Sequence, residues 1–123
     1  MFYGDSAVDE SKDMVNMWGD YLRSDIMQAN HHGLNGATIE LYERTDPTVV
    51  LVPMGTRYVP KVLSYAASRW IWNNVSGNIR EVILFGWGER VLELPYTPGE
   101  DTPYFASGDQ DPWAGIETEY IAN

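Results

Sequence analysis

The run TVVLVP, residues 48–53, sets four consecutive aliphatic side chains between Pro47 and Pro53. A short, unbroken, mostly β-branched run of this kind is typical of a strand that is buried on both faces. DIMQAN (25–30), EVILFG (81–86) and RVLELPY (90–96) are further strand candidates. The spacing of Gly86 and Gly88 in the intervening WGE segment predicts that the last two pair as a hairpin.

Segments with helical spacing of apolar residues alternate with these strands. Residues 9–22 carry a stripe of Val15, Trp18 and Leu22, with Gly19 as a weak point, and TIELYERT (38–45) begins at a potential N-cap, Thr38. Residues 60–74 carry a wide apolar stripe and are predicted to form a single helix. The alternation of strands and helices predicts an α/β layer structure.

Composition excludes several classes of function before any motif is considered. The chain has 123 residues and a net charge of -10, so a basic face for nucleic acid is not expected. It has no cysteine, which excludes disulfides and thiolate chemistry. No signal peptide or membrane-length apolar run is evident, and the compartment stays undetermined. Residues 97–123 form an acidic tail rich in Gly and Pro, which we expect to be either poorly ordered or a strap held by Tyr104, Phe105 and Trp113.

Two short segments hold the residues with the clearest chemical potential. In YGDS, Asp5 follows a strand-like end and a glycine, so it either projects into a site or caps the following helix. In NHHG, His31 and His32 are the only histidines of the chain, and neutral imidazole is a common metal ligand. On a strand, adjacent residues face opposite ways, so only one of the pair would face a given site. An exposed surface loop is the alternative. Arg57 is either a contact for an anionic group or a surface residue.

Taken together, FYGD, SDIMQANHHGLNGA and DPTVVLVP resemble the C-terminal half of the metallo-β-lactamase fold. The similarity is strongest to the lactamase-like domain of bacterial DNA-uptake (competence) proteins. It covers residues 1–95, and residues 24–53 are its most specific part. The resemblance implies half of an αββα sandwich, with a mixed sheet and helices packed on it, over residues 1–96.

The resemblance also implies roles for individual residues. Asp5 matches the aspartate that bridges two metal ions, zinc or manganese, in the family. His32 is the preferred match to the last histidine ligand, with Gly33 as the small residue that follows it, and His31 is the alternative. Asp25 is left as a structural or outer carboxylate.

The family's leading signature, His-x-His-x-Asp-His, is absent from this chain. A hydrolytic zinc site needs at least three protein ligands, so we expect a fragment of a metal-dependent hydrolase, inactive alone, whose first Met is internal to a parent protein. The parent would cleave a phosphoester or a related bond. The alternative is a non-catalytic α/β module that forms a homodimer or pairs with a missing N-terminal half. Either way, one sheet face would be left uncovered.

Overall fold

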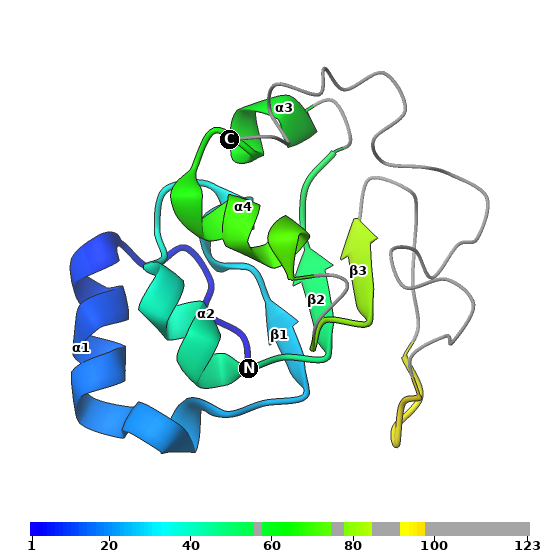
Figure 1. Cartoon of the computed structure of the whole chain (residues 1–123), viewed down its shortest axis with the longest axis horizontal. Coiled ribbons are helices and arrows are strands. Elements are labelled where there is room, and N and C mark those ends of the chain that lie inside the picture. The colour runs from blue at the N-terminus through cyan, green and yellow to red at the C-terminus, as the bar shows by residue number, and fades with distance from the viewer. Residues whose placement is uncertain (56–57, 75–77, 85–91, 98–123) are drawn as a thin grey trace.

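The protein has a mixed α/β fold, as the alternation of segments predicts. The computed structural model describes residues 1–55, 58–74, 78–84 and 92–97 (Figure 1). In chain order its elements are α1 (Val8–Trp18), the 3₁₀ turn η1 (Gly19–Leu22), β1 (Ile26–Gln28), the 3₁₀ turn η2 (Asn30–Gly33), α2 (Ile39–Thr45), β2 (Val49–Val52), α3 (Val59–Val62), α4 (Ala66–Asn73) and β3 (Glu81–Leu84).

The three strands form one sheet in the order β1-β2-β3, and both pairs are parallel. The N-terminal segment runs beside β1, where Phe2 makes a parallel bridge to Gln28. A backbone hydrogen bond holds this segment against β1: the Gln28 N–H donates to the Met1 carbonyl at 2.8 Å. All described strands therefore end at the same edge of the sheet. The mixed sheet that we expected is not found among them.

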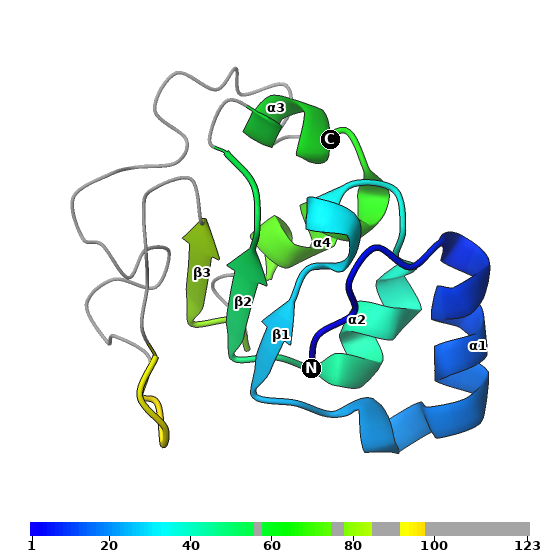
Figure 2. The same cartoon turned by 180° about the vertical axis from the view of Figure 1, so that it is seen from behind.

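The helices lie on one side of this sheet, and segment 92–97 lies on the other (Figures 1 and 2). Alternate strand side chains divide between two apolar clusters. On the helix side, Met27, Val50 and Val82 pack with residues of α2 and α4. On the other side, Val49, Leu51 and Ile83 pack with Leu92 and Tyr96.

The second sheet face is less open than the sequence led us to expect. Val49, Leu51 and Ile83 are buried, with exposed fractions of 1%, 7% and 0%. The expectation of an uncovered sheet face is therefore wrong at these positions. Leu92 and Tyr96 account for part of this burial, because they pack directly on the cluster.

Residues 60–74 do not form the single helix that their apolar spacing predicts. The helix is broken into α3 and α4 between Val62 and Ala66. Side chains take up the carbonyls at the break: Ser64 Oγ donates to the Lys61 carbonyl, and the Arg69 guanidinium donates to those of Leu63 and Ser64. Such bonds compete with the helical ladder, and apolar periodicity does not register them.

The first helix is shorter than expected, and less of its apolar stripe is buried. It ends at Trp18, and Gly19 caps it with a φ of 46°, a conformation that favours glycine. Residues 19–22 then form η1. Leu22 is buried as predicted, but Trp18 is 55% exposed, so the apolar stripe does not face the core along its whole length.

The predicted hairpin is not formed by the described residues. Glu81–Leu84 is a strand, but residues 92–97 contain no strand, and WGE and the start of RVLELPY lie outside the described residues. The Tyr96 hydroxyl instead donates to the Glu81 carboxylate across the sheet face. The tail from residue 98, with Tyr104, Phe105 and Trp113, also lies outside the described residues, so the boundary at 96 and 97 stays a prediction. Within the described part, no helix has the length and apolarity of a membrane span.

Candidate functional site

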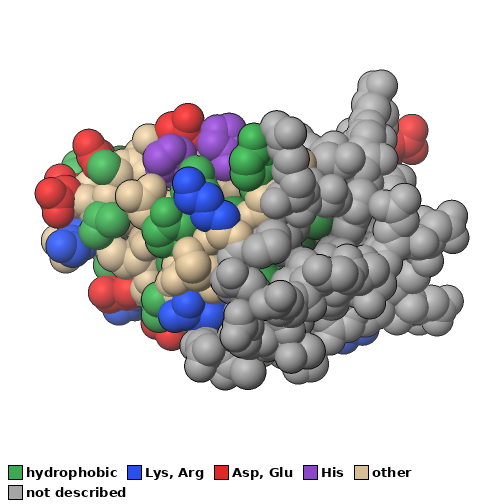
Figure 3. Space-filling view, turned by 90° about the horizontal axis from the view of Figure 1, so that it is seen from above, with side chains coloured by type: hydrophobic (Ala, Val, Ile, Leu, Met, Phe, Trp, Pro, Cys, Tyr) green, Lys and Arg blue, Asp and Glu red, His purple; other side chains and the backbone are tan. Residues whose placement is uncertain are grey.

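The segments that carry Asp5 and the histidine pair meet at the carboxyl edge of the parallel sheet. Asp5 follows the N-terminal segment, His32 follows β1, and Pro53 follows β2. Ligands of open parallel α/β sheets bind at this edge, because loops from neighbouring strands converge there. Figure 3 views the molecule from above this edge and shows both histidines at the surface, next to acidic, basic and hydrophobic side chains.

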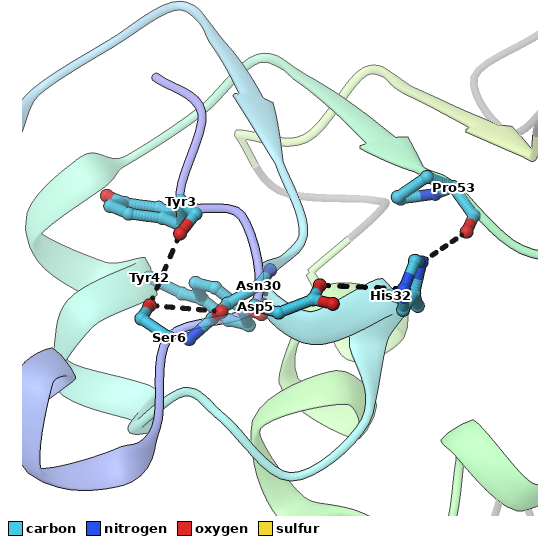
Figure 4. Close-up of polar contacts among 7 residues, drawn as sticks. All are labelled: Tyr3, Asp5, Ser6, Asn30, His32, Tyr42 and Pro53. Carbon is cyan, nitrogen blue, oxygen red and sulfur yellow. Dashed lines mark hydrogen bonds and ion pairs between the residues drawn. The ribbon is translucent and has the colours of Figure 1, made fainter.

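His32 joins Asp5 to the loop after β2 (Figure 4). Its Nδ1 lies 2.7 Å from the Pro53 carbonyl oxygen, and its Nε2 lies 3.5 Å from Asp5 Oδ1. A carbonyl oxygen only accepts, so Nδ1 carries a hydrogen, and in the neutral form of the ring the Nε2 lone pair faces the carboxylate. Two electron-pair donors thus point into one space. Metal-binding histidines are typically anchored in this way, with the second ring nitrogen on a backbone carbonyl.

Both side chains remain accessible to solvent. The Asp5 side chain is 60% exposed and the His32 side chain 47%. A cation or an attacking water can therefore reach the space between them without opening the core. The charge of the pair is negative when the imidazole is neutral, so the arrangement favours a cation there.

The NHHG turn is strained in a way that alternation along a strand does not predict. His31 and His32 have φ values of 46° and 58°, followed by Gly33 at 82°. Left-handed conformations in non-glycine residues cost roughly 1–2 kcal/mol each, and such outliers gather at functional sites. The expectation that the two histidines lie on opposite strand faces is therefore wrong, because β1 ends at Gln28 and both belong to η2.

The backbone of the turn is held by one bond within it and by bonds to two other segments, the N-terminal segment and α4. The His31 N–H donates to the Gly4 carbonyl at 2.8 Å, and the Leu34 N–H returns to the His31 carbonyl at 2.8 Å. The Ser68 hydroxyl of α4 donates to the Gly33 carbonyl. The bond from His31 to Gly4 fixes the turn that carries Asp5 against the turn that carries His32.

Within the described residues, His32 contacts the Asp5 carboxylate and His31 does not. The ring of His31 lies beside that of His32, with 6.1 Å between their centroids. His32 is therefore the histidine that shares a space with Asp5. The metal role of Asp5, His32 and His31 stays a prediction.

Asn30 supports the site from beneath and is a residue that the sequence reasoning missed. Its side chain is fully buried, accepts from Ser6 Oγ at 3.2 Å and donates to Ser11 Oγ at 3.3 Å. Its backbone N–H donates to the Tyr42 hydroxyl at 3.0 Å. Burial raises the pKa of the Tyr42 hydroxyl. Asn30 thereby connects the Asp5 turn, α1 and α2 to the start of the NHHG turn. In the sequence, the only indication of this role was its position directly before the two histidines.

The other sequence candidates lie away from this edge or outside the described residues. Asp25 precedes β1 and so sits at the opposite, amino edge of the sheet, where its carbonyl accepts from the N–H groups of Thr48 and Val49. It therefore does not share the site of Asp5 and His32. Arg57 lies outside the described residues.

The donors present fit part of a metal site. No group of three or more His, Asp or Glu side chains is close enough to hold an ion within the described ranges. Catalytic zinc sites in proteins use three protein ligands and an open position. Asp5 and His32 would supply two of these, and any further ligand would have to come from outside the described residues.

Two of the hollows that described residues line border the strands of the sheet. The larger, about 650 Å³, is lined by Phe2, Asp25, Ile26 and Leu94 among others and lies at the amino edge, away from the site. The smaller, about 260 Å³, adjoins His32 at the carboxyl edge. The position at the strand ends, and not the size, decides which of the two is relevant to Asp5 and His32.

No protein-family model matches this chain, and neither a curated protein nor a solved structure shows a significant similarity to it. The likeness to metallo-β-lactamases therefore rests on the motifs themselves. The juxtaposition of Asp5 and His32 adds a geometric observation to those motifs.

Proposed function

We propose that this chain is part of a metal-dependent hydrolase of the metallo-β-lactamase superfamily and supplies Asp5 and His32 to its metal centre. The observation that supports this is the pairing of His32 Nε2 with Asp5 Oδ1, at 3.5 Å, at the carboxyl edge of the sheet. The bond from Nδ1 to the Pro53 carbonyl orients the ring so that Nε2 faces the carboxylate. The complete parent would act on a phosphoester or a related bond.

Each residue has a distinct part in this proposal. Asp5 would provide a carboxylate oxygen, His32 would provide Nε2, and Asn30 would hold the backbone beneath both. When bound, zinc or manganese would supply a Lewis acid and a water of lowered pKa. Two protein donors bind an ion weakly and lower the pKa of its water little, so the chain by itself is proposed to be inactive or nearly so.

A metal-binding titration tests the proposal directly. Cobalt(II) added to the chain should give a visible absorption band whose intensity follows site occupancy. His32→Ala and Asp5→Asn should each weaken binding by about 10–100-fold, the range seen even for outer-sphere partners of metal sites. Asp25→Asn makes the same charge change at the far edge of the sheet and should leave binding unchanged. Equal binding by all four proteins would contradict the proposal.

A hydrolysis assay tests the expected lack of activity. Bis(4-nitrophenyl) phosphate is incubated with the chain and excess zinc or manganese, and release of nitrophenolate is followed. Turnover should stay at the level of the metal alone. Turnover that His32→Ala abolishes would show that the two donors suffice for catalysis, and would overturn this part of the proposal.

We infer a second candidate function, a non-catalytic module that associates with a second copy of this chain. Phe2 and Leu94 are 72% and 76% exposed, and both line the 650 Å³ hollow at the amino edge. Large exposed apolar side chains beside a hollow are typical of interaction surfaces. Sedimentation of the wild type and of Phe2→Ser tests this: a dimer that the substitution dissociates supports it, and a wild-type monomer at high concentration contradicts it.

A further inference from the structure

The cavity beside His32 is lined largely by apolar side chains from three segments. Leu34 follows the NHHG turn, Pro53 and Met54 follow β2, and Val62 ends α3. Met54 and Val62 are 9% and 1% exposed, so this wall belongs to the packed core and keeps its shape. Figure 3 shows the same surface, with hydrophobic side chains directly beside the histidines.

The polar lining of the cavity includes an imidazole and an ammonium group. His32 forms one part of its lining and Lys61 another. Lys12, Arg23 and Arg44 each lie within 4 Å of a carboxylate. In the portion of the chain that the structure describes, Lys61 has no such partner, a property that it shares with Arg69 and Arg80. An unneutralised ammonium at an apolar cavity, in a chain of net charge -10, marks a local preference for an anion.

We propose that this cavity is the substrate pocket of the site and takes a phosphate ester with one compact apolar substituent. This inference rests on the proposed function. The substituent lies against Leu34, Met54 and Val62, while the phosphate group lies at the mouth beside the Lys61 ammonium. The arrangement combines an apolar body with a few convergent polar groups, which is the usual make-up of a small-molecule site.

The size of the cavity sets the size of the substituent. A volume of about 260 Å³ lies just below the range of roughly 300–1,000 Å³ that holds drug-sized ligands. The pocket therefore suits a single aromatic ring or a short branched alkyl group. A polyanionic nucleic acid is disfavoured, because one lysine does not offset the strongly acidic chain.

Titration with phenyl phosphate, followed by methyl NMR of the full-length chain, tests the pocket. Phenyl phosphate should shift the methyl signals of Leu34, Met54 and Val62 and bind at least tenfold more tightly than inorganic phosphate. Lys61→Met keeps most of the aliphatic stem and should weaken phenyl phosphate binding about tenfold. Lys12→Met removes the same charge from α1, away from the pocket, and should leave it unchanged.

The outcomes separate this pocket from the metal proposal. Phenyl phosphate that binds no better than inorganic phosphate, or equally well to Lys61→Met and Lys12→Met, would overturn the pocket even if cobalt binds at Asp5 and His32. Phenyl phosphate binding that depends on Lys61 would support the pocket even if cobalt binding were unaffected by His32→Ala. Shifts confined to residues at the amino edge would also overturn it, because they would place the ligand in the 650 Å³ hollow.

Discussion

Replacing Gly36 by alanine should loosen the support of the candidate site. Gly36 is buried in the loop before α2, and a Cβ added there would lie closer to the Ser6 carbonyl oxygen than real Cβ contacts allow. It would also lie 3.0 Å from Asn30 Nδ2 and 3.0 Å from His31 Cβ. The loop and the Asp5 turn therefore have to separate. Because the Ser6 oxygen belongs to the backbone, no rotation of a side chain relieves the contact.

The expected destabilisation is about 3 kcal/mol, at the upper end of the roughly 1–3 kcal/mol that overpacking costs. In a domain of this length that corresponds to a fall in Tm on the order of 10 °C. Thermal unfolding followed by far-ultraviolet circular dichroism measures it. Cobalt binding should weaken in the same variant, because the displaced Ser6 is next to Asp5.

Two other glycines supply matched controls. Among the described residues, a Cβ at Gly55 would meet only Tyr58 Cδ2, at an ordinary 3.9 Å, so Gly55→Ala should melt close to the wild type. At Gly19 no atom of the described residues lies within 4 Å of an added Cβ but φ is 46°, so Gly19→Ala isolates backbone strain, about 1–2 kcal/mol. A Gly36→Ala protein that melts within about 2 °C of Gly55→Ala would refute the argument from close approach.

Three further substitutions test the support of the site and its helices. Asn30→Ala removes the side-chain bonds to Ser6 and Ser11 and should lower the free energy of unfolding by about 2 kcal/mol in urea titrations. Thr38→Ala removes the side-chain oxygen that accepts from the Leu41 N–H at the start of α2, and should cost about 1 kcal/mol in the same assay. Tyr42→Phe leaves the buried Asn30 N–H without its acceptor and should cost about 1–2 kcal/mol. Burial raises the pKa of the Tyr42 hydroxyl above 10.0, so the contribution of this group to folding stability is complete below pH 10 and is lost as the pH rises further. The midpoint of urea unfolding should therefore fall more steeply from pH 9 to 11 for the wild type than for Tyr42→Phe.

Elements with strong local signals were predictable from the sequence. TVVLVP forms the central strand β2, with all four residues buried, because an unbroken aliphatic run has to be covered on both faces. TIELYERT forms α2, with the Thr38 side chain accepting from the Leu41 N–H at 3.2 Å. Gly19 ends α1, as its low helix propensity suggested.

Elements that depend on particular side-chain hydrogen bonds were mispredicted. The break between α3 and α4 depends on Arg69 and Ser64 side chains that take up backbone carbonyls. Segment 92–97 is apolar enough for a strand, yet it lies across the sheet face, with Tyr96 bonded to Glu81. Apolar periodicity records which residues are buried, but it does not record which backbone groups are already bonded elsewhere.

The sequence by itself determined which residue types are available at the candidate site: one carboxylate after a glycine, two histidines, and no thiol. The tertiary structure alone decided their geometry. The left-handed turn at His31 and His32 forms because Gly4 and Ser68 bind its backbone from segments remote in sequence, and that turn aims His32 at Asp5. A conformation that a histidine pair disfavours locally persists only where long-range bonds outweigh the local strain, and no local pattern encodes that balance.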